Sequence, residues 1–359
     1  MNLFLRLTWC CFIGFCLVAC QETEDINAPG SNPSGGASTS FAWTIPANQV
    51  FDGGVGKDGI PSIDQPEFSS VEEADRIPDW EFIVAVKRGN EIKAYPHNIL
   101  DWHEIVNDRI SGKNFALTYC PLTGTAIGWE RGEGTFGVSG LLYNSNLIPY
   151  DRISGSYWSQ MLNESVRGVR VDEEVERIAV MESRWRDFKK DFPEARVLTR
   201  NTGFDRNYDN YPYGDYRSSP DLLFPVARRD SRVFAKERVH GIQMSGINRI
   251  YQFDAFQETS FLIDEMEGTD ILLMGNREMG FISSFVMEPV RGETLVFSAV
   301  SDPTLDRFIT DQFGNYWNVF GEVSDGPNVG IKLTPAPSYM GFYFAWAAFN
   351  PSLQIYGSE

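Results

Sequence analysis

The chain has 359 residues, of which 42% are hydrophobic and 14% aromatic, enough to build one large domain or two ordinary ones. Its formal net charge is -18, from 49 acidic and 31 basic residues. This balance argues against nucleic acid and against an anionic membrane surface as partners, because both require clustered lysine and arginine. Composition alone therefore indicates a soluble, secreted, acidic protein.

The N-terminus has the pattern of an export signal. Residues 1–6 are weakly basic, and residues 7–19 are apolar but too short to span a bilayer as a helix. The stretch ends in LVAC at residues 17–20, which resembles a lipobox with Cys20 as the acylated residue. The alternative is an ordinary secretory signal. We favour a lipoprotein that the acyl chains on Cys20 anchor to a lipid membrane.

Two further expectations concern the start of the mature chain. Gln21 follows Cys20 where an aspartate would suggest inner-membrane retention, so we expect the outer membrane, on its periplasmic face or at the cell surface. Residues 21–45 are rich in serine, glycine and proline and are predicted to form a flexible tether. The globular part is then expected over residues 46–359. Removal of the signal peptide leaves Cys120 as the only free thiol, with no intramolecular disulfide.

After the tether, short apolar runs are separated by glycine, proline, asparagine and aspartate. Runs such as residues 82–86, 115–119 and 294–297 are typical of strands. Residues 183–191 are predicted to form an amphipathic helix, with Ser183 as its cap and Pro193 beyond its end. These elements predict a β-rich α+β fold.

Three landmarks recur in the same order at nearly constant spacing. A hairpin pattern ends at Tyr95 and again at Tyr251, 156 residues later; a turn followed by Tyr-Trp ends at Trp158 and again at Trp317, 159 residues later. An aromatic pair precedes Pro193 and again Pro351, 158 residues later. We therefore expect two pseudo-repeated units, over roughly residues 80–200 and 236–356, each closed by a short aromatic helix.

The repeat separates architecture from chemistry. Features present in both units are expected to be architectural, and features present in one unit are better candidates for function. Cys120 and His103 lie in the first unit and have no equivalent in the second. We therefore expect any site in the first unit.

Several motifs of the chain also resemble a known family, the domain-of-unknown-function family 3179. They are DGIP at residues 58–61, AYP at 94–96, HEIVND at 103–108, TYCPLTG at 118–124, FGVSGLLYNS at 136–145, YDR at 150–152, GSYWSQ at 155–160 and FAWAAF at 344–349. The resemblance extends from about residue 50 to the C-terminus and so indicates where the domain begins and ends. The family has no established activity, so the resemblance implies little about chemistry. Many members carry a second cysteine where this chain has Thr123, which weakens the case for a Cys-x-x-Cys dithiol or a two-thiolate metal site.

Cys120 is the centre of the candidate chemistry. It ends a predicted strand at a turn, where a side chain can project from a rigid scaffold. With His103 it could form a thiolate–imidazole pair, with His103 as base and Asp108 or Glu104 as orienter. The same pair could bind copper or zinc, with His97, Glu104 or Asp108 as a third ligand. The third interpretation is a buried cysteine that acts as a small hydrophobic residue.

Other polar residues are weaker candidates. Ser139, Tyr143 and Asn144 could line a pocket beside Cys120, although GVSGL is not the Gly-x-Ser-x-Gly elbow of a serine hydrolase. Asp151 and Arg152 could bind a polar ligand, but a turn-stabilising ion pair is preferred because Asp311 recurs in the second unit.

The remaining patterns favour structural roles. His97 is expected at the surface, and His240 is expected to be a satisfied structural histidine. Residues 52–58 lack the context of a phosphate loop, and residues 205–216 lack the glycine and glutamate of an EF-hand. The aromatic linker between the units could stack on a sugar, but packing between the units explains it more simply.

Three functions follow as hypotheses. The leading one is a metal- or small-ligand-binding envelope protein centred on Cys120 and His103. The second is a cysteine-dependent enzyme with Cys120 as nucleophile. The third is a structural or surface-interaction lipoprotein without a small-molecule site.

Overall fold

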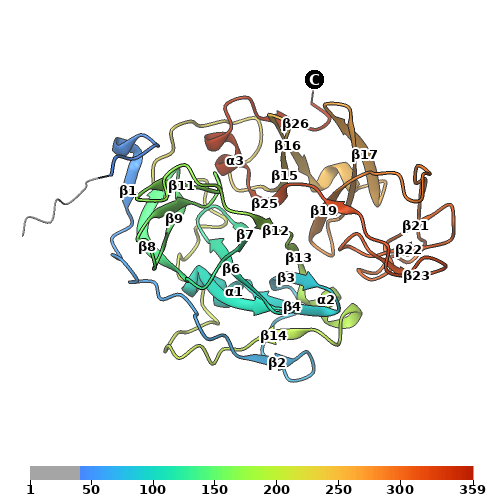
Figure 1. Cartoon of the computed structure of the whole chain (residues 1–359), viewed down its shortest axis with the longest axis horizontal. Helices are drawn as coiled ribbons and strands as arrows, with labels where there is room; N and C mark the ends of the chain where they lie inside the picture. Colours follow the sequence, from blue (N-terminus) through green and yellow to red (C-terminus); the bar gives the residue numbers. More distant parts are fainter. Residues whose placement is uncertain (1–40, 359) are drawn as a thin grey trace, which may run out of the picture. The chain divides into compact units, whose positions relative to one another are not determined.

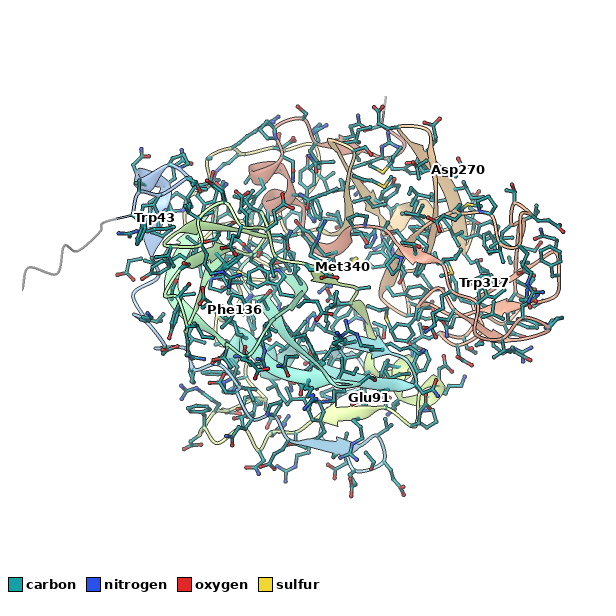
Figure 2. All side chains as sticks on the ribbon, in the orientation of Figure 1. Trp43, Glu91, Phe136, Asp270, Trp317 and Met340 are labelled. Atoms are coloured by element: carbon teal, nitrogen blue, oxygen red, sulfur yellow. The ribbon has the colours of Figure 1, made fainter. Side chains whose placement is uncertain are left out.

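The computed structural model describes residues 41–358. The expected signal peptide, Cys20 and residues 21–40 of the expected tether lie outside them. Residues 41–45, also assigned to the tether, are packed: the Trp43 ring lies 5.6 Å from the Tyr157 ring, and Ile45 is buried (Figure 2). The described domain therefore begins earlier than expected. None of its helices has the length and apolar character needed to cross a membrane.

The described part of the chain is β-rich, with small sheets and few helices, as the sequence predicts (Figure 1). Its helices are α1 (His97–His103), α2 (Trp185–Asp191) and α3 (Tyr343–Phe349), with short 3-10 turns η1 (Ala47–Gln49) and η2 (Phe253–Phe256). The predicted helix at residues 183–191 begins two residues later, because Ser183 belongs to a strand and caps nothing. Trp185 and Phe188 share its buried face, as predicted.

Three sheets lie between residues 50 and 198. In spatial order, the first is β13 (Met181–Arg184), β3 (Phe82–Arg88), β4 (Glu91–Pro96), β14 (Arg196–Leu198) and β2 (Phe68–Ser70). The second is β12 (Arg177–Ile178), β7 (Thr125–Glu130), β6 (Lys113–Cys120) and β5 (Ile105–Ile110). The third is β1 (Val50–Asp52), β8 (Phe136–Tyr143), β9 (Asn146–Asp151), β10 (Tyr157–Ser159) and β11 (Glu164–Arg167).

Three more sheets lie between residues 238 and 355. The first is β25 (Ser338–Phe342), β15 (Arg238–Met244), β16 (Ile247–Gln252) and β26 (Gln354–Ile355). The second is β17 (Phe261–Met266), β18 (Thr269–Asn276), β19 (Phe281–Val286) and β24 (Thr334–Pro335). The third is β20 (Phe297–Ala299), β21 (Ile309–Asp311), β22 (Tyr316–Trp317) and β23 (Val323–Asp325). The strand predicted at residues 294–297 is therefore wrong in all but its last residue.

Both predicted hairpins are present, and each continues into a parallel pairing. β3 and β4 form an antiparallel hairpin whose second strand pairs in parallel with β14. β15 and β16 do the same, and β16 pairs in parallel with β26. We call the part of the chain up to residue 198 the first half and the part from residue 238 the second half.

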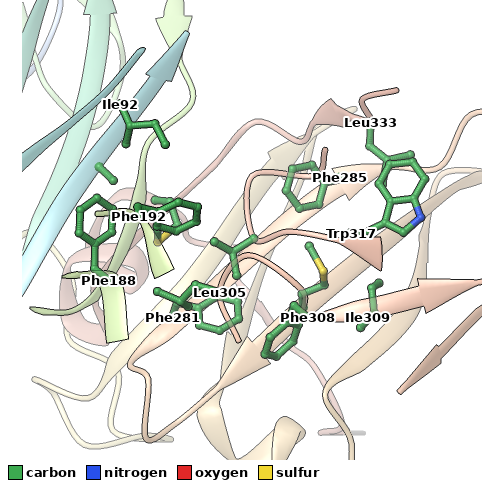
Figure 3. Close-up of a cluster of buried hydrophobic side chains, with 14 of the residues drawn as sticks. Ile92, Phe188, Phe192, Phe281, Phe285, Leu305, Phe308, Ile309, Trp317 and Leu333 are labelled. Carbon is green, nitrogen blue, oxygen red and sulfur yellow. The ribbon is translucent and has the colours of Figure 1, made fainter. Parts of the chain in front are cut away.

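One hydrophobic cluster draws on both halves (Figure 3). Ile92 and Phe188 of the first half are buried together with Phe281, Phe308 and Trp317 of the second. The Phe281 and Phe308 rings meet edge to face, with centroids 4.7 Å apart. Because this core is shared, neither half can bury its apolar surface alone.

Candidate functional site

Cys120 ends strand β6, as the sequence predicts. The chain then turns, with the Thr123 amide donating to the Cys120 carbonyl at 3.2 Å. The side chain is 1% exposed, and its thiol lies 3.7 Å from the Ser145 carbonyl. Burial, with a smaller effect of the nearby Glu104 carboxyl, raises the pKa of Cys120 to about 11. The thiol is therefore protonated at neutral pH, which is the opposite of an activated nucleophile.

His103 does not pair with Cys120. Its Nδ1 lies 2.8 Å from the Pro61 carbonyl, and its Nε2 lies 2.6 Å from the Tyr208 hydroxyl. Burial lowers the pKa of His103 to about 4, so the ring is neutral. With both ring nitrogens engaged, neither is free for a thiol or a metal. Within residues 41–358, no group of three or more His, Cys, Asp or Glu side chains is arranged to hold a metal ion.

Glu104, the next residue along the chain, is near enough to Cys120 for its carboxyl to raise the pKa of the thiol. It caps the C-terminus of α1 with a φ of 57°, a conformation that is strained for a residue other than glycine. Its side chain is buried, and Tyr213 donates a 3.4 Å hydrogen bond to its Oε1. Burial raises the pKa of Glu104 to about 8, although the Tyr213 hydrogen bond opposes this. At neutral pH the carboxyl therefore carries a proton.

Glu104 and Tyr213 are the polar groups on the wall of a cavity of about 70 Å³. The rest of the wall is apolar, with Leu122, Leu147 and Phe224 among its side chains, and Val55 also lines it while remaining 46% exposed. A space of this size exceeds what a single water needs. The cavity can therefore take a small molecule that has one polar group and an apolar body.

A network of charged and polar groups, most of them buried, joins the first half to Arg238 at the start of the second half and to Arg217 of the linker. Arg238 donates to Glu182 at 2.7 Å, and His97 Nε2 lies 2.8 Å from the same carboxylate. Although burial alone would raise it, the Arg238 guanidinium and then His97 bring the pKa of Glu182 down to about 2. Burial lowers the pKa of His97 to about 4. His97 is thus a neutral ring, 1% exposed, and the expectation that it lies at the surface is wrong.

The network continues from His97 through Tyr119 and Arg217 to Asp101. The Tyr119 hydroxyl lies 3.3 Å from His97 Nδ1 and accepts a hydrogen bond from Arg217, also at 3.3 Å. Arg217 also donates to both oxygens of Asp101, at 2.6 and 2.9 Å. Burial raises the pKa of Asp101 to about 7, against the effect of Arg217. Such shifts in one region are typical of functional sites, although structural ion pairs also produce them.

Several residues predicted to bind ligand have structural roles instead. Asp108 accepts hydrogen bonds from Tyr95 at 2.6 Å and from Lys93 at 3.0 Å, so it orients neither His103 nor Cys120. Ser139 donates its hydroxyl to the Ile148 carbonyl within the β8–β9 sheet.

The end of β8 is held in the same way. Asn144, in a left-handed conformation with a φ of 50°, accepts the Ala227 amide at 2.7 Å. The Tyr143 ring meets the Phe349 ring edge to face, with centroids 5.4 Å apart. None of Ser139, Tyr143 and Asn144 lines the cavity beside Glu104.

Asp151 and Arg152 do not pair with each other. Asp151 accepts the Ser154 amide at 2.6 Å and the Trp158 ring N–H at 3.1 Å. Arg152 instead bonds to Asp58 at 2.9 Å and Asp64 at 3.1 Å. Asp151 thus stabilises a turn, as expected, while the predicted ion pair between these neighbours is wrong.

Thr123, the position at which the sequence resemblance implied a second cysteine in other proteins, belongs to a buried polar network. Its hydroxyl lies 2.9 Å from that of Thr125 and accepts a hydrogen bond from the Asn146 amide at 2.9 Å. The position therefore joins the turn after Cys120 to strand β9 and leaves no second thiol beside the first.

Four residues of the site were not found from the sequence: Asp101, Glu182, Arg217 and Tyr213. Arg217 and Tyr213 come from the aromatic linker, which lies against the first half. The Tyr216 hydroxyl donates to the Leu122 carbonyl at 2.9 Å, so the linker packs on the turn that follows Cys120. The available sequence signal was an arginine directly after the last tyrosine of the linker, Tyr216-Arg217.

The fold and this site define a β-rich domain in which neutral and paired ionisable groups are buried around a small cavity. The chain belongs to the family described as protein of unknown function (DUF3179), whose model matches residues 57–353. This confirms the resemblance carried by the motifs. No curated protein and no solved structure matches the chain.

Proposed function

We propose that the protein is a cell-envelope lipoprotein that binds a small, uncharged, largely apolar molecule in the cavity beside Cys120. The observation that carries this is the pairing of Glu104 with Tyr213 on an otherwise apolar wall. Ligand sites commonly combine apolar walls with a few well-placed polar groups.

The chemistry of the two polar groups indicates the ligand class. With its pKa raised to about 8, Glu104 donates a hydrogen bond at neutral pH, and Tyr213 can donate or accept. A charged ligand would lose its hydration in this apolar space without a full counter-charge. Short alcohols, ketones and amides meet these conditions.

The distribution of ionisable residues between the halves supports a site in the first half. We infer that the halves are copies of one unit, because their sheets follow the same strand orders once the added edge strands β1 and β2 are set aside. Both also contain a Tyr–Asp pair: Tyr95 with Asp108, and Tyr251 with Asp264, each at 2.6 Å. With the 156-residue spacing of the two tyrosines, Glu104 corresponds to Ser260.

The same comparison extends to the other members of the site. At the same 156-residue spacing, Phe253 corresponds to His97, Gln257 to Asp101 and Asn276 to Cys120. His97, Asp101, Glu104 and Cys120 thus have no titratable counterpart in the second copy. Under this proposal His103 is a positioning residue, since its two hydrogen bonds hold the end of α1 where Glu104 follows.

The other hypotheses have less support. A copper or zinc site would need His103 to give up the Pro61 or Tyr208 contact. A cysteine nucleophile would need a cation near a thiol whose strongest influences are burial and an acidic neighbour. Anchoring through Cys20 rests on the sequence pattern. Mass spectrometry of the mature N-terminus, with Cys20→Ser as control, tests it by the presence or loss of the diacylglyceryl group.

The ligand proposal is tested by titrating the protein with tert-butanol, cyclopentanone and a short amide while following backbone NMR signals. We expect saturable shifts at residues around Glu104 and Leu147. Val55→Trp should abolish them by filling the accessible side of the cavity. Val329→Trp, at a residue 65% exposed and outside the cavity lining, is the matched control and should leave them unchanged. Absence of saturable shifts in the wild type, or their persistence in Val55→Trp, would contradict the proposal.

A further inference from the structure

A larger cavity, of about 280 Å³, lies where the β3–β4 hairpin of the first half meets the second half. Its volume is near the lower end of the range for small-molecule sites, roughly 300 Å³ upward. The first half contributes Lys87, Arg88 and Met181, and the second half contributes His240 and Ser284. It shares no lining residue with the cavity beside Glu104.

The charged groups on its wall are mainly cationic. Lys87, Arg88 and Lys332 line it together with one carboxylate, Glu322, to which both lysines are paired. Arg88 is paired with Glu130 through one guanidinium nitrogen, while its Nη1 is buried and has no hydrogen-bond partner in the described part of the chain. In a protein of net charge -18, a wall with three cationic side chains and one carboxylate favours an anion.

A polar chain lies among the second-half residues of the same cavity. His240 Nε2 is 2.9 Å from the Ser284 hydroxyl, which is 2.9 Å from that of Ser338. Burial lowers the pKa of His240 to about 3, so the ring is neutral. Its Nδ1 has no hydrogen-bond partner within residues 41–358. The expectation that both ring nitrogens of His240 are hydrogen-bonded is therefore wrong for Nδ1. Because no carboxylate bonds to Nδ1, the His240–Ser284 contact is not a catalytic triad.

The remaining wall is apolar, with Met181, Phe285, Val319, Phe320 and Leu333 among its side chains. We propose that this cavity binds a small amphipathic carboxylate, whose acid group pairs with Arg88 and Lys332 and whose apolar body lies against Phe285 and Phe320. The ligand is thus of a different chemical class from the uncharged molecule proposed for the first cavity. Guanidinium and ammonium groups form the strongest hydrogen bonds available to a carboxylate.

The test uses calorimetric titration of the whole mature chain, held in lipid nanodiscs, with empty nanodiscs as the blank. The probes are pentanoate, pentanol and pentylamine, which share a tail and differ in head group. We expect saturable binding of pentanoate, with pentanol and pentylamine at least about tenfold weaker, the factor that one lost charge-assisted hydrogen bond produces. Failure of pentanoate to bind, or pentanol binding equally well, would overturn the proposal.

Variants then locate the binding. Lys332→Glu reverses a charge on a side chain that is 49% exposed, so it should fold normally and weaken pentanoate about tenfold or more. Lys113→Glu makes the same change at an exposed lysine of β6, outside the cavity lining, and should leave binding unchanged. Equal binding by the two variants would overturn the assignment. Val55→Trp should not affect pentanoate, which separates this site from the one beside Glu104.

Discussion

Beneath hairpins of the same strand order, the two halves bury different kinds of side chain. The first half encloses Asp101, Glu104 and Glu182, whereas the residues at the 156-residue spacing from the first two are Gln257 and Ser260. Buried ionisable groups cost free energy unless they are paired or neutral. In the first half, Glu104 is neutral because it retains its proton, and Glu182 is paired with Arg238. In the second half, the residues at the 156-residue spacing from Asp101 and Glu104 are not ionisable. The difference teaches that the fold itself does not require these groups.

The largest expected effect comes from removing the cation that neutralises Glu182. Arg238→Met would leave a buried carboxylate without its cation, which should lower the free energy of unfolding by about 3–5 kcal/mol. Urea denaturation measures it. Met340→Leu is a conservative change at the position of β25 that pairs with His240 as Glu182 pairs with Val84, and it should cost less than about 1.5 kcal/mol. Similar losses in the two variants would remove the distinction between the halves.

The next effect is the pH dependence due to Glu104. Its pKa is about 8 in the folded protein against 4.5 as the ordinary value, so the folded state retains a proton that the unfolded state releases. Stability should therefore fall as pH rises from about 4.5 to about 8, by a few kcal/mol at about 1.4 kcal/mol per pKa unit. Glu104→Gln should reduce this slope and stabilise the protein at pH 8, approximately where the loss is complete. Ser260→Ala should leave the slope unchanged, and an unaltered slope in Glu104→Gln would contradict the raised pKa.

The proposal that the halves are copies of one unit predicts equal effects at their Trp–Asp turns. Trp158 and Trp317 donate to Asp151 and Asp311 at 3.1 and 2.9 Å. Replacing either with Phe leaves a buried carboxylate oxygen short of a donor, at a cost of about 1–3 kcal/mol. Thermal and urea unfolding of Trp158→Phe and Trp317→Phe should give matching losses. A loss confined to one variant would show that the two turns are not equivalent.

The smallest effect on stability is expected at Cys120, whose chemistry is the sharper readout. With a pKa of about 11, the thiol should react with iodoacetamide at neutral pH at least about a hundredfold more slowly than a free cysteine. Cys120→Ala measures the background, and Asn276→Cys, at the corresponding position of the second half, is the comparison thiol. Rapid labelling of Cys120 in the folded protein would restore the hypothesis of a cysteine nucleophile.

Local patterns were sufficient for much of the fold. The two hairpins, the strand that ends at Cys120 and the buried face of α2 follow from alternation, turn residues and helical spacing. Ser183 was misassigned because its pairing with Ile83, far away in sequence, extends β13 where a cap was expected. His97 was misjudged because α1 begins directly after Pro96 and packs against neighbouring strands, which no local pattern reveals.

The candidate site was less predictable for the same physical reason. Its central contacts join residues distant in sequence: Arg238 with Glu182, Arg217 with Asp101, and Tyr213 with Glu104. Motif proximity suggested His103 as the partner of Cys120, but the adjacent Glu104 is the residue that lies beside it. Restricting the search to features of the first half was useful, whereas the choice among them needed the tertiary structure.

The shared core has a consequence for how the chain is made. Ile92 and Phe188 complete their packing only with Phe281 and Trp317, which are synthesised much later. During synthesis, the first half must therefore leave part of its apolar surface exposed to solvent until most of the polypeptide has been made. During that interval the exposed apolar segments are prone to aggregate. Late closure of the core makes this protein a natural client for chaperones that hold unfolded chains.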